Sequence, residues 1–240
     1  MFDDLLGNDN DADNSIEYIK YVSIDMIDDF QDHPFNVGEE CDLLQMSDSI
    51  KENGILSPAI IRKKVDGRYE MISGHRRKKA CELAMLDKIP CIVKDLSDEE
   101  ATILMVDSNI QREKVLPSEK AYAYKMKLDA LRSQGKRNDL TLFQNETRLD
   151  NIKKIGENNN DSRTKVYRYI RLTNLLPDFL DMIDNDFLGK APRMGLTIGF
   201  ELSFLKEEEQ FILLDAMDCY DASPSHSQAI ELKQLSRDGK

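Results

Sequence analysis

Strand-like segments occur only in the first half of this sequence, and that asymmetry limits the fold more than any other feature. Four segments are rich in aliphatic, β-branched and aromatic residues: Tyr18–Ile24, Ala59–Lys63, Tyr69–Ile72 and Ile89–Val93. Asp66-Gly67 stands between the second and third segments and predicts a hairpin turn. Helical patterns alternate with these strands up to about residue 110, and no convincing strand follows. The sequence therefore predicts an α+β protein, with a small mixed α/β N-terminal domain followed by an all-helical domain.

Apolar residues at helical spacing, together with start and stop signals, place the helices and the domain boundaries. The predicted helices are Leu43–Asn53, His75–Leu86, one opened by a capping box of Ser97 and Glu100, one from Pro117 to about Leu131, residues 148–158, and Arg163–Leu172. Residues 133–146 are polar and predict a loop. We expect a disordered acidic tail at residues 1–15, the α/β domain at 16–115 and the helical domain at 116–240.

Composition argues against several classes of protein. The apolar runs are far shorter than the roughly 18 residues that a membrane helix needs. The acidic, polar start of the chain is unlike a signal peptide. The four cysteines form no CxxC pair and the three histidines lie far apart in sequence, so we expect no zinc site. These features predict a cytoplasmic protein without a membrane partner.

The formal net charge of −12 at first argues against a nucleic-acid partner, but the charge is unevenly distributed. Residues 1–110 carry 12 Lys and Arg against 24 Asp and Glu, and residues 177–240 carry 6 against 13. Residues 111–176 carry 15 against 8. A basic middle between acidic flanks can form a local phosphate-binding surface, or it can be a solvated helix face.

Residues 148–172 have the pattern of a helix-turn-helix. The first helix has Leu149, Ile152 and Ile155 at spacings of three, which predicts a single apolar face. Asn159, Asn160 and Asp161 follow, and such residues tolerate the left-handed conformation of a tight turn. Ser162 is a good N-cap for the second helix.

The second helix is basic on its predicted outer face, because Val166 and Ile170 point inward with Tyr169 beside them. The candidate DNA-binding residues are Ser162, Arg163, Thr164, Lys165, Tyr167, Arg168 and Arg171. The N-terminal part of a recognition helix enters the major groove, which places Arg163, Thr164, Lys165 and Arg168 nearest the base edges. Tyr167 and Arg171 are better placed for phosphates. An ordinary helical hairpin with a solvated basic face has the same pattern.

A second basic element, Gly74-His75-Arg76-Arg77, follows a strand and begins a helix. Glycine permits a close backbone approach, the first N–H groups of the helix point outward, and the helix dipole favours negative charge. The two arginines can clamp a phosphate. The pattern indicates an anion site, although arginines at a helix start are more often partners in surface ion pairs. The polar segment Asp107–Glu113 would supply Asn109 and Arg112 if it lies near the same phosphates.

Four ordered motifs resemble the ParB partition-protein family. They are Gly74–Ala80 (GHRRKKA), Ile89–Val93 (IPCIV), Ser108–Arg112 (SNIQR) and Leu116–Ala121 (LPSEKA). Gly54–Pro58 upstream also matches, and Ser162–Pro177 is similar to the helix-turn-helix of that family and its exit. The resemblance covers about residues 16–185.

The resemblance implies a dimer that binds a palindromic double-stranded DNA site in plasmid, mobile-element or chromosome partition, with a ParA-type ATPase as partner. It implies a location on the bacterial nucleoid or on a plasmid. It also implies a CTP site with Mg²⁺ in the N-terminal domain. The residues carried over are Gly74, His75, Arg76, Arg77, Ser108, Asn109 and Arg112 for the nucleotide, and Asn109 and Asp107 for the metal.

The sequence departs from the family pattern at three places. His75 and Ser108 stand where the family commonly has Glu, so a CTPase activity is left open. His33-Pro34-Phe35 replaces a Gln-Pro-Arg segment, which removes one arginine from the implied pocket. Binding without efficient hydrolysis and loss of nucleotide binding are both compatible with these changes. No C-terminal dimerisation domain is evident, so we expect either a short relative or dimerisation by another route.

Other functions fit parts of the sequence. Sulfiredoxin is similar in the N-terminal domain, but Ser73 and Gly74 precede His75 here, so its reactive Cys is missing. A free-serine kinase on this scaffold would need a general base, and His75 or Asp107 can serve. A nuclease would need a cluster of metal-binding carboxylates, which the sequence does not show. A transcriptional regulator would share the DNA-binding helix and differ in operator and partner.

Overall fold

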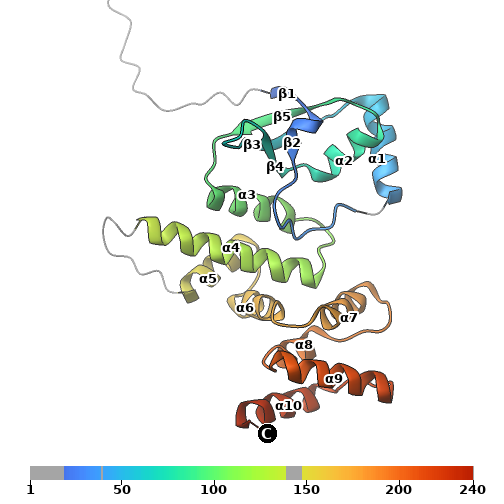
Figure 1. The fold of residues 1–240 in the computed structure, drawn as a ribbon, viewed down its shortest axis with the longest axis vertical. Coiled ribbons are helices and arrows are strands. Elements are labelled where there is room, and N and C mark those ends of the chain that lie inside the picture. The colour runs from blue at the N-terminus through green and yellow to red at the C-terminus, as the bar shows by residue number, and fades with distance from the viewer. Residues whose placement is uncertain (1–18, 39, 139–147, 240) are drawn as a thin grey trace, which may run out of the picture. The chain divides into compact units, whose positions relative to one another are not determined.

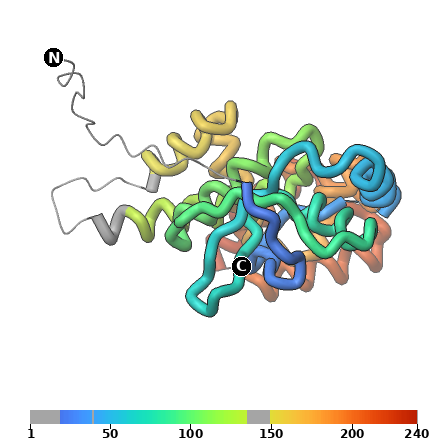
Figure 2. Tube along the Cα trace, turned by 90° about the horizontal axis from the view of Figure 1, so that it is seen from above, coloured from blue at the N-terminus to red at the C-terminus, as the bar shows by residue number. Residues whose placement is uncertain are grey.

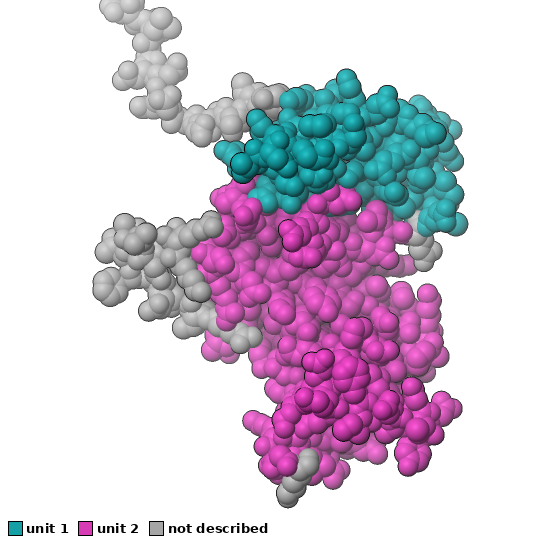
Figure 3. Space-filling model, viewed as in Figure 1, with its two compact units in different colours: residues 1–28, 39–95 teal, residues 29–38, 96–240 magenta. Residues whose placement is uncertain are grey.

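A computed structural model describes residues 19–38, 40–138 and 148–239. The chain forms two compact units, which Figure 3 shows in different colours. The first comprises Met1–Asp28 and Glu39–Asp95, and the second comprises Asp29–Gly38 and Leu96–Lys240. The division therefore falls after Asp95, whereas the sequence predicts a boundary after residue 115. The predicted acidic tail lies outside the described residues.

The first unit is a mixed five-stranded sheet with two helices (Figure 1). Its elements are β1 (Ile19–Ser23), β2 (Ile27–Asp28), α1 (Glu40–Asn53), β3 (Ala59–Lys63), β4 (Tyr69–Ser73), α2 (His75–Leu83) and β5 (Lys88–Lys94), with a 3₁₀ turn at Ile24–Met26. The strand order is β1-β5-β3-β4-β2, with β3 antiparallel to β4 and parallel to β5. All four predicted strands are confirmed, and the two-residue β2 was not predicted.

The β3–β4 hairpin, teal in Figure 2, turns at the predicted position. Gly67 has φ 85°, and the backbone N–H of Lys64 donates to the carbonyl of Arg68 at 2.8 Å. The side chain of Asp66 accepts from the backbone N–H of Arg68 at 2.9 Å. The turn therefore uses the side chain of Asp66 as a hydrogen-bond acceptor and the positive φ that Gly67 readily adopts.

The core of this unit is formed by small and branched apolar side chains. Ile61, Met71, Ile89 and Cys91 of the sheet are fully buried, together with Ala80 and Cys81 of α2. The predicted end of the second helix is wrong by three residues, because α2 stops at Leu83. Met85 takes a left-handed φ of 58°, which no continuing α-helix allows.

The second unit contains eight described helices, which confirms an all-helical region after the mixed sheet. They are α3 (Asp98–Ile110), α4 (Pro117–Asn138), α5 (Arg148–Asn158), α6 (Arg163–Leu172), α7 (Pro177–Leu188), α8 (Leu196–Leu202), α9 (Glu207–Tyr220) and α10 (His226–Asp238). The capping box of Ser97 and Glu100 is present at the start of α3. The loop predicted at 133–146 is wrong over residues 133–138, which continue α4, and its remainder lies outside the described residues.

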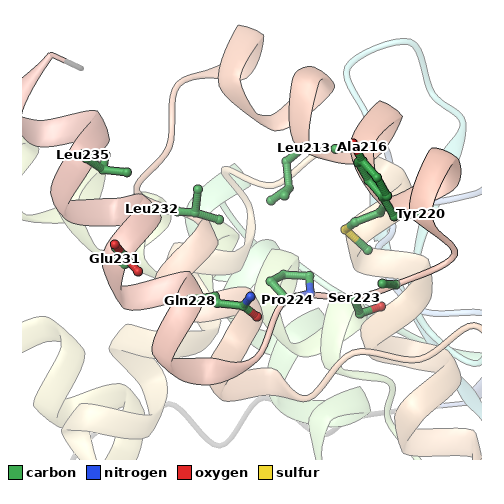
Figure 4. A pocket seen from close by; sticks show the side chains of 11 residues that line it. Leu213, Ala216, Tyr220, Ser223, Pro224, Gln228, Glu231, Leu232 and Leu235 are labelled. Atoms are coloured by element: carbon green, nitrogen blue, oxygen red, sulfur yellow. The ribbon is translucent and has the colours of Figure 1, made fainter.

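Helices α9 and α10 enclose an apolar groove with a cavity of about 290 Å³ (Figure 4). Leu213 of α9 and Leu232 and Leu235 of α10 line it. Elsewhere on α9, the buried amide of Gln210 accepts from the backbone N–H of Leu176 at 2.9 Å and donates to the carbonyl of Asn174 at 3.0 Å. This amide ties α9 to the segment that leaves α6.

None of the helices in the described part of the chain is both long enough and apolar enough to cross a membrane.

Prediction: we expect Glu70→Gln to lower the free energy of unfolding by about 2 kcal/mol, because it removes the carboxylate charge that faces Arg62 in a nearly buried site. Arg62 and Glu70 pair across β3 and β4, with Nη2 and Oε2 2.6 Å apart and side chains only 14% and 9% exposed. Urea denaturation measures the change.

The matched control for this prediction is Glu82→Gln, because Glu82 pairs with Lys79 at 3.0 Å on the surface of α2. Exposed pairs of this kind contribute little, so we expect a loss below about 0.5 kcal/mol. Equal losses for the two variants would show that burial does not strengthen the Arg62–Glu70 pair.

Candidate nucleic-acid interface and anion site

Helices α5 and α6 are joined by a short turn that depends on a close backbone approach. The carbonyl of Gly156 accepts from the backbone N–H groups of Asn159 at 3.1 Å and Asp161 at 3.0 Å. A Cβ atom at Gly156 would lie only 2.4 Å from the carbonyl oxygen of Asp161. Asn160 takes φ 56°, as the sequence predicts for this turn. Glycine inside α5 is therefore required by the turn, although glycine weakens a helix.

The carboxylate of Asp161 links this turn to two helices. One oxygen accepts from the hydroxyl of Tyr124 on α4 at 2.6 Å, and the other pairs with Nζ of Lys165 on α6 at 2.6 Å. Burial acts to raise the pKa of Asp161, but the bonds from Lys165 and Tyr124 outweigh it and hold that pKa below its usual value. Burial and the bond to Asp161 raise the pKa of Tyr124, so its hydroxyl remains a donor.

The inward face of α6 is the predicted one. Val166, Tyr169 and Ile170 are buried, and Leu172 is buried with them. The N-cap is also confirmed, because the hydroxyl of Ser162 accepts from the backbone N–H of Lys165 at 3.2 Å. The candidates that are exposed near the start of α6 are Ser162, Arg163, Thr164, Lys165 and Arg168. The structure thus brings five of the seven candidate DNA-binding residues to one exposed surface.

The other two candidates, Tyr167 and Arg171, are half-buried against α8 and the residues that follow it. The ring of Tyr167 meets that of Phe200 edge-on, with centroids 6.2 Å apart. Arg171 donates to the backbone carbonyl of Ser203 and lies 4.1 Å from the ring centroid of Phe204. The sequence did not predict these contacts, since no local pattern connects segments about 30 residues apart.

The predicted apolar face of α5 is wrong at its first position. Ile152 and Ile155 are buried, but Leu149 is 50% exposed and Asn151 is buried in its place. Two steps of three residues turn a helix about 120° away from its starting direction. Leu149 therefore falls off the face that Ile155 defines.

The Gly74–Arg77 element lies in the first unit, where Gly74 precedes α2 with φ 117°. A Cβ atom at Gly74 would lie 2.9 Å from that of Ala59, so only glycine fits. No side chain caps the start of α2, and His75 is buried. A helix start without a capping side chain has N–H groups available to an anion.

The two arginines of this element have different surroundings. Nη2 of Arg76 lies 3.6 Å from the carboxylate of Asp42, and Nε of Arg76 is buried without a hydrogen-bond partner. Nη1 of Arg77 donates to the carbonyls of Ser57 and Pro58 at 2.5 and 2.7 Å. Burial lowers the pKa of Arg77. Arg76 is thus the better candidate for an anion, and Arg77 holds the segment before β3.

The remaining candidates lie at the end of α3 in the second unit. Lys127 is buried and pairs with the carboxylate of Asp107. The amide nitrogen of Asn109 donates to the carbonyl of Met105 at 2.8 Å, and the hydroxyl of Ser108 donates to the same carbonyl at 3.0 Å.

Arg112 lies just after the end of α3 and contacts the segment around Phe35, where the sequence departs from the ParB pattern. Its guanidinium lies 5.7 Å from the ring centroid of Phe35, and Nη1 donates to the carbonyl of Asn36 at 3.3 Å. Within the described residues, no group of three or more His, Cys, Asp or Glu side chains is arranged to hold a metal ion.

Comparison with known proteins agrees with this geometry. A family model of the ParB N-terminal domain matches residues 8–110. The curated relatives described below extend the match over most of the chain. Residues 8–110 thus match the ParB N-terminal domain, and the chain is similar to ParB proteins over most of its length. The ParB-family resemblance of the motifs around Gly74 and Ser108 is thereby confirmed.

Two curated relatives carry this assignment. The chromosome-partitioning protein Spo0J of Thermus thermophilus is 34% identical over 192 residues, which is 80% of this chain and 61% of the relative. The probable chromosome-partitioning protein ParB of Borreliella burgdorferi is 35% identical over 164 residues, or 68% of this chain and 56% of the relative. The chain thus spans little more than half the length of these ParB relatives.

Two solved structures share the fold. One is the C-terminally truncated ParB of Caulobacter crescentus complexed to the centromeric parS site, with TM-score 0.50, 21% identity, and coverage of 91% of this chain and 99% of that one. The other is a Pnob8-like ParB-N domain, with TM-score 0.53, 14% identity, and coverage of 91% and 92%. Both confirm the predicted α+β fold class.

Prediction: we expect Gly156→Ala to destabilise the protein by roughly 1–3 kcal/mol, because the clash with the carbonyl of Asp161 outweighs the helix propensity gained. Thermal or urea unfolding measures this change. Gly195→Ala is the matched control, since a Cβ atom there meets nothing within 4 Å. A Gly156→Ala variant as stable as the wild type would contradict the close approach.

Proposed function

We propose that this chain is a sequence-specific DNA-binding protein of the ParB type that acts in partition of a plasmid, a mobile element or a chromosome. The observation that carries the proposal is the helix-turn-helix of α5 and α6, with its capped and basic second helix. The curated relatives of the chain are named as chromosome-partitioning proteins, which supports the same function. A nucleoid or plasmid location follows from it.

In this proposal the start of α6 enters the major groove of a duplex. Arg163 and Arg168 are exposed, and the planar fork of an arginine donates two parallel hydrogen bonds to guanine O6 and N7. Thr164 and Lys165 lie beside them. Lys165 keeps its ion pair with Asp161, so we assign it to the backbone rather than to a base. We further propose a palindromic site bound by two copies, and a ParA-type ATPase as partner.

The proposal includes CTP as a ligand of the α2 start, as similarity to ParB proteins suggests. No side chain caps the first N–H groups of α2, and the buried Nε of Arg76 has no hydrogen-bond partner. An anion there would satisfy both groups. Asn109 and Arg112 of the second unit are also proposed as nucleotide contacts. Substituting each with Ala and measuring CTP binding by calorimetry tests this assignment. His75 and Ser108 supply no carboxylate, so hydrolysis is not part of the proposal.

The arrangement does not fit a magnesium site built on Asp107. Its carboxylate already pairs with the buried ammonium of Lys127. A cation that approached Asp107 would be repelled by Lys127, and a displaced Lys127 would remain buried without its partner. The proposal therefore contains no metal at Asp107.

Prediction: Arg163→Ala and Arg168→Ala should each weaken specific DNA binding by at least about 10-fold, since a bidentate contact to guanine contributes roughly 1–3 kcal/mol. The measurement is fluorescence anisotropy on a duplex selected by the wild type from a random-sequence library. A scrambled duplex gives the non-specific affinity.

The matched control for these variants is Arg237→Ala, because Arg237 is an exposed arginine of α10 and not of α6. We expect its affinity for both duplexes to match that of the wild type. If Arg163→Ala and Arg168→Ala both bind the selected duplex normally, α6 is not the recognition helix.

Prediction: Arg76→Ala should weaken CTP binding by at least about 10-fold and leave recognition of the selected duplex unchanged. Calorimetry measures the affinity for CTP, and fluorescence anisotropy measures the affinity for the selected duplex. Lys79→Ala is the control, because Lys79 is an exposed cation of the same helix that pairs with Glu82. An unchanged CTP affinity in Arg76→Ala would refute the phosphate contact.

A further inference from the structure

Two aromatic side chains, Phe200 of α8 and Phe204 just after it, form an aromatic stack beside the recognition helix. Their rings meet edge-on, with centroids 5.3 Å apart and planes at 86°. The guanidinium of Arg168 lies 5.5 Å from the centroid of Phe200, and that of Arg171 lies 4.1 Å from the centroid of Phe204. Both arginines belong to α6, so each aromatic ring holds one arginine of that helix.

Lys233 of α10 places its ammonium against the rings of this aromatic stack. Its Nζ lies 4.0 Å from the ring centroid of Phe204 and 5.7 Å from that of Phe200. The same ammonium pairs with Glu201 of α8 at 2.7 Å, and the two side chains are only 21% and 14% exposed. Partial burial strengthens the attraction between a cation and a ring. Glu201 offsets the charge of Lys233, which reduces its repulsion of the nearby arginines.

The two arginines are held in different ways. Arg171 donates to the backbone carbonyl of Ser203, and its Nε donates to the hydroxyl of that residue at 3.4 Å. Its guanidinium is thus committed to the end of α8. Arg168 is exposed and lies over Phe200, and a stacked guanidinium keeps the N–H groups at its edge available. The stack anchors α6 through Arg171 and presents Arg168.

We propose that Phe200, Phe204 and Lys233 are positioning residues for DNA recognition. The ring of Phe200 orients Arg168, while Phe204 and Lys233 fix the angle of α6 through Arg171. An arginine that is already oriented loses less conformational freedom when it binds a base. The inference rests on the proposed role of α6 and extends the recognition apparatus to α8 and α10, whose residues act through the two arginines.

The test is a double-mutant cycle on Phe200 and Arg168, with the selected and scrambled duplexes as probes. Phe200→Leu removes the ring, and Phe200→Tyr keeps it. We expect Phe200→Leu to lower the ratio of the two affinities by about 3-fold, the size of one cation–π contact, and Phe200→Tyr to leave it unchanged. In the Arg168→Ala background, Phe200→Leu should cause no further loss, because the ring acts through that arginine.

Lys233 provides an independent measurement. Lys233→Met removes the charge and keeps most of the apolar length, and Lys233→Arg keeps the cation. We expect Lys233→Met to lower the affinity ratio and Lys233→Arg to retain it. Phe211→Leu is the matched control, because Phe211 of α9 is 52% exposed and lies outside the stack. Its affinity ratio should equal that of the wild type.

The outcomes separate this inference from the function on which it rests. Additive losses in the cycle would overturn the positioning role of Phe200, as would an equal loss in Phe211→Leu. If Phe200→Leu does not fold, as thermal unfolding would show, equal affinity ratios for Lys233→Met and Lys233→Arg would overturn the proposal instead. If Arg168→Ala alone leaves the ratio unchanged, Phe200 has no base contact to position and the inference fails. If Arg163→Ala leaves the ratio unchanged as well, the recognition-helix assignment fails, and that result does not depend on Phe200.

Discussion

The carboxylate of Asp161 is the point on which the helix-turn-helix depends. It sits in the turn between α5 and α6 and accepts from Tyr124 of α4 while pairing with Lys165 of α6. A buried carboxylate is stable only when such donors surround it, so the same contacts that satisfy Asp161 also tie the turn after α5 to α4 and α6. The missing side chain of Gly156 permits the arrangement, because any Cβ atom would meet the carbonyl of Asp161.

The recognition helix is thus supported from two directions. On one side Tyr124 and Tyr169 meet edge-on, with ring centroids 6.0 Å apart, and this contact joins α4 to α6. On the other side Arg171 is fixed to Ser203 and Phe204 at the end of α8. Because both supports bind the inner and lateral faces of α6, the exposed side chains at its start are the ones left for a ligand. A site on a rigid element is more precise than one on a loop.

Local patterns predicted much of this molecule, and long-range contacts account for what they missed. The strands, the hairpin at Asp66-Gly67 and the buried face of α6 follow from periodicity and turn chemistry, which involve residues close in sequence. Helix α4 continues through a polar segment, and a few residues of sequence do not show where such a helix ends. The exposure of Leu149 results from helix rotation that accumulates over six residues. The roles of Arg77 and Arg171 depend on carbonyl groups of Ser57 and Ser203, which no spacing in the sequence indicates.

The acidic composition of the chain makes the orientation of the α6 side chains more important for DNA binding. A chain with a formal net charge of −12 attracts phosphates weakly outside its basic middle segment, so non-specific DNA binding is expected to contribute less than in a basic protein. Specific contacts must then supply a larger share of the affinity. Such contacts are most effective when the side chains are oriented before binding, because less conformational entropy is lost. Anchoring α6 through Arg171 and stacking Arg168 on Phe200 meet that requirement without adding positive charge to the surface.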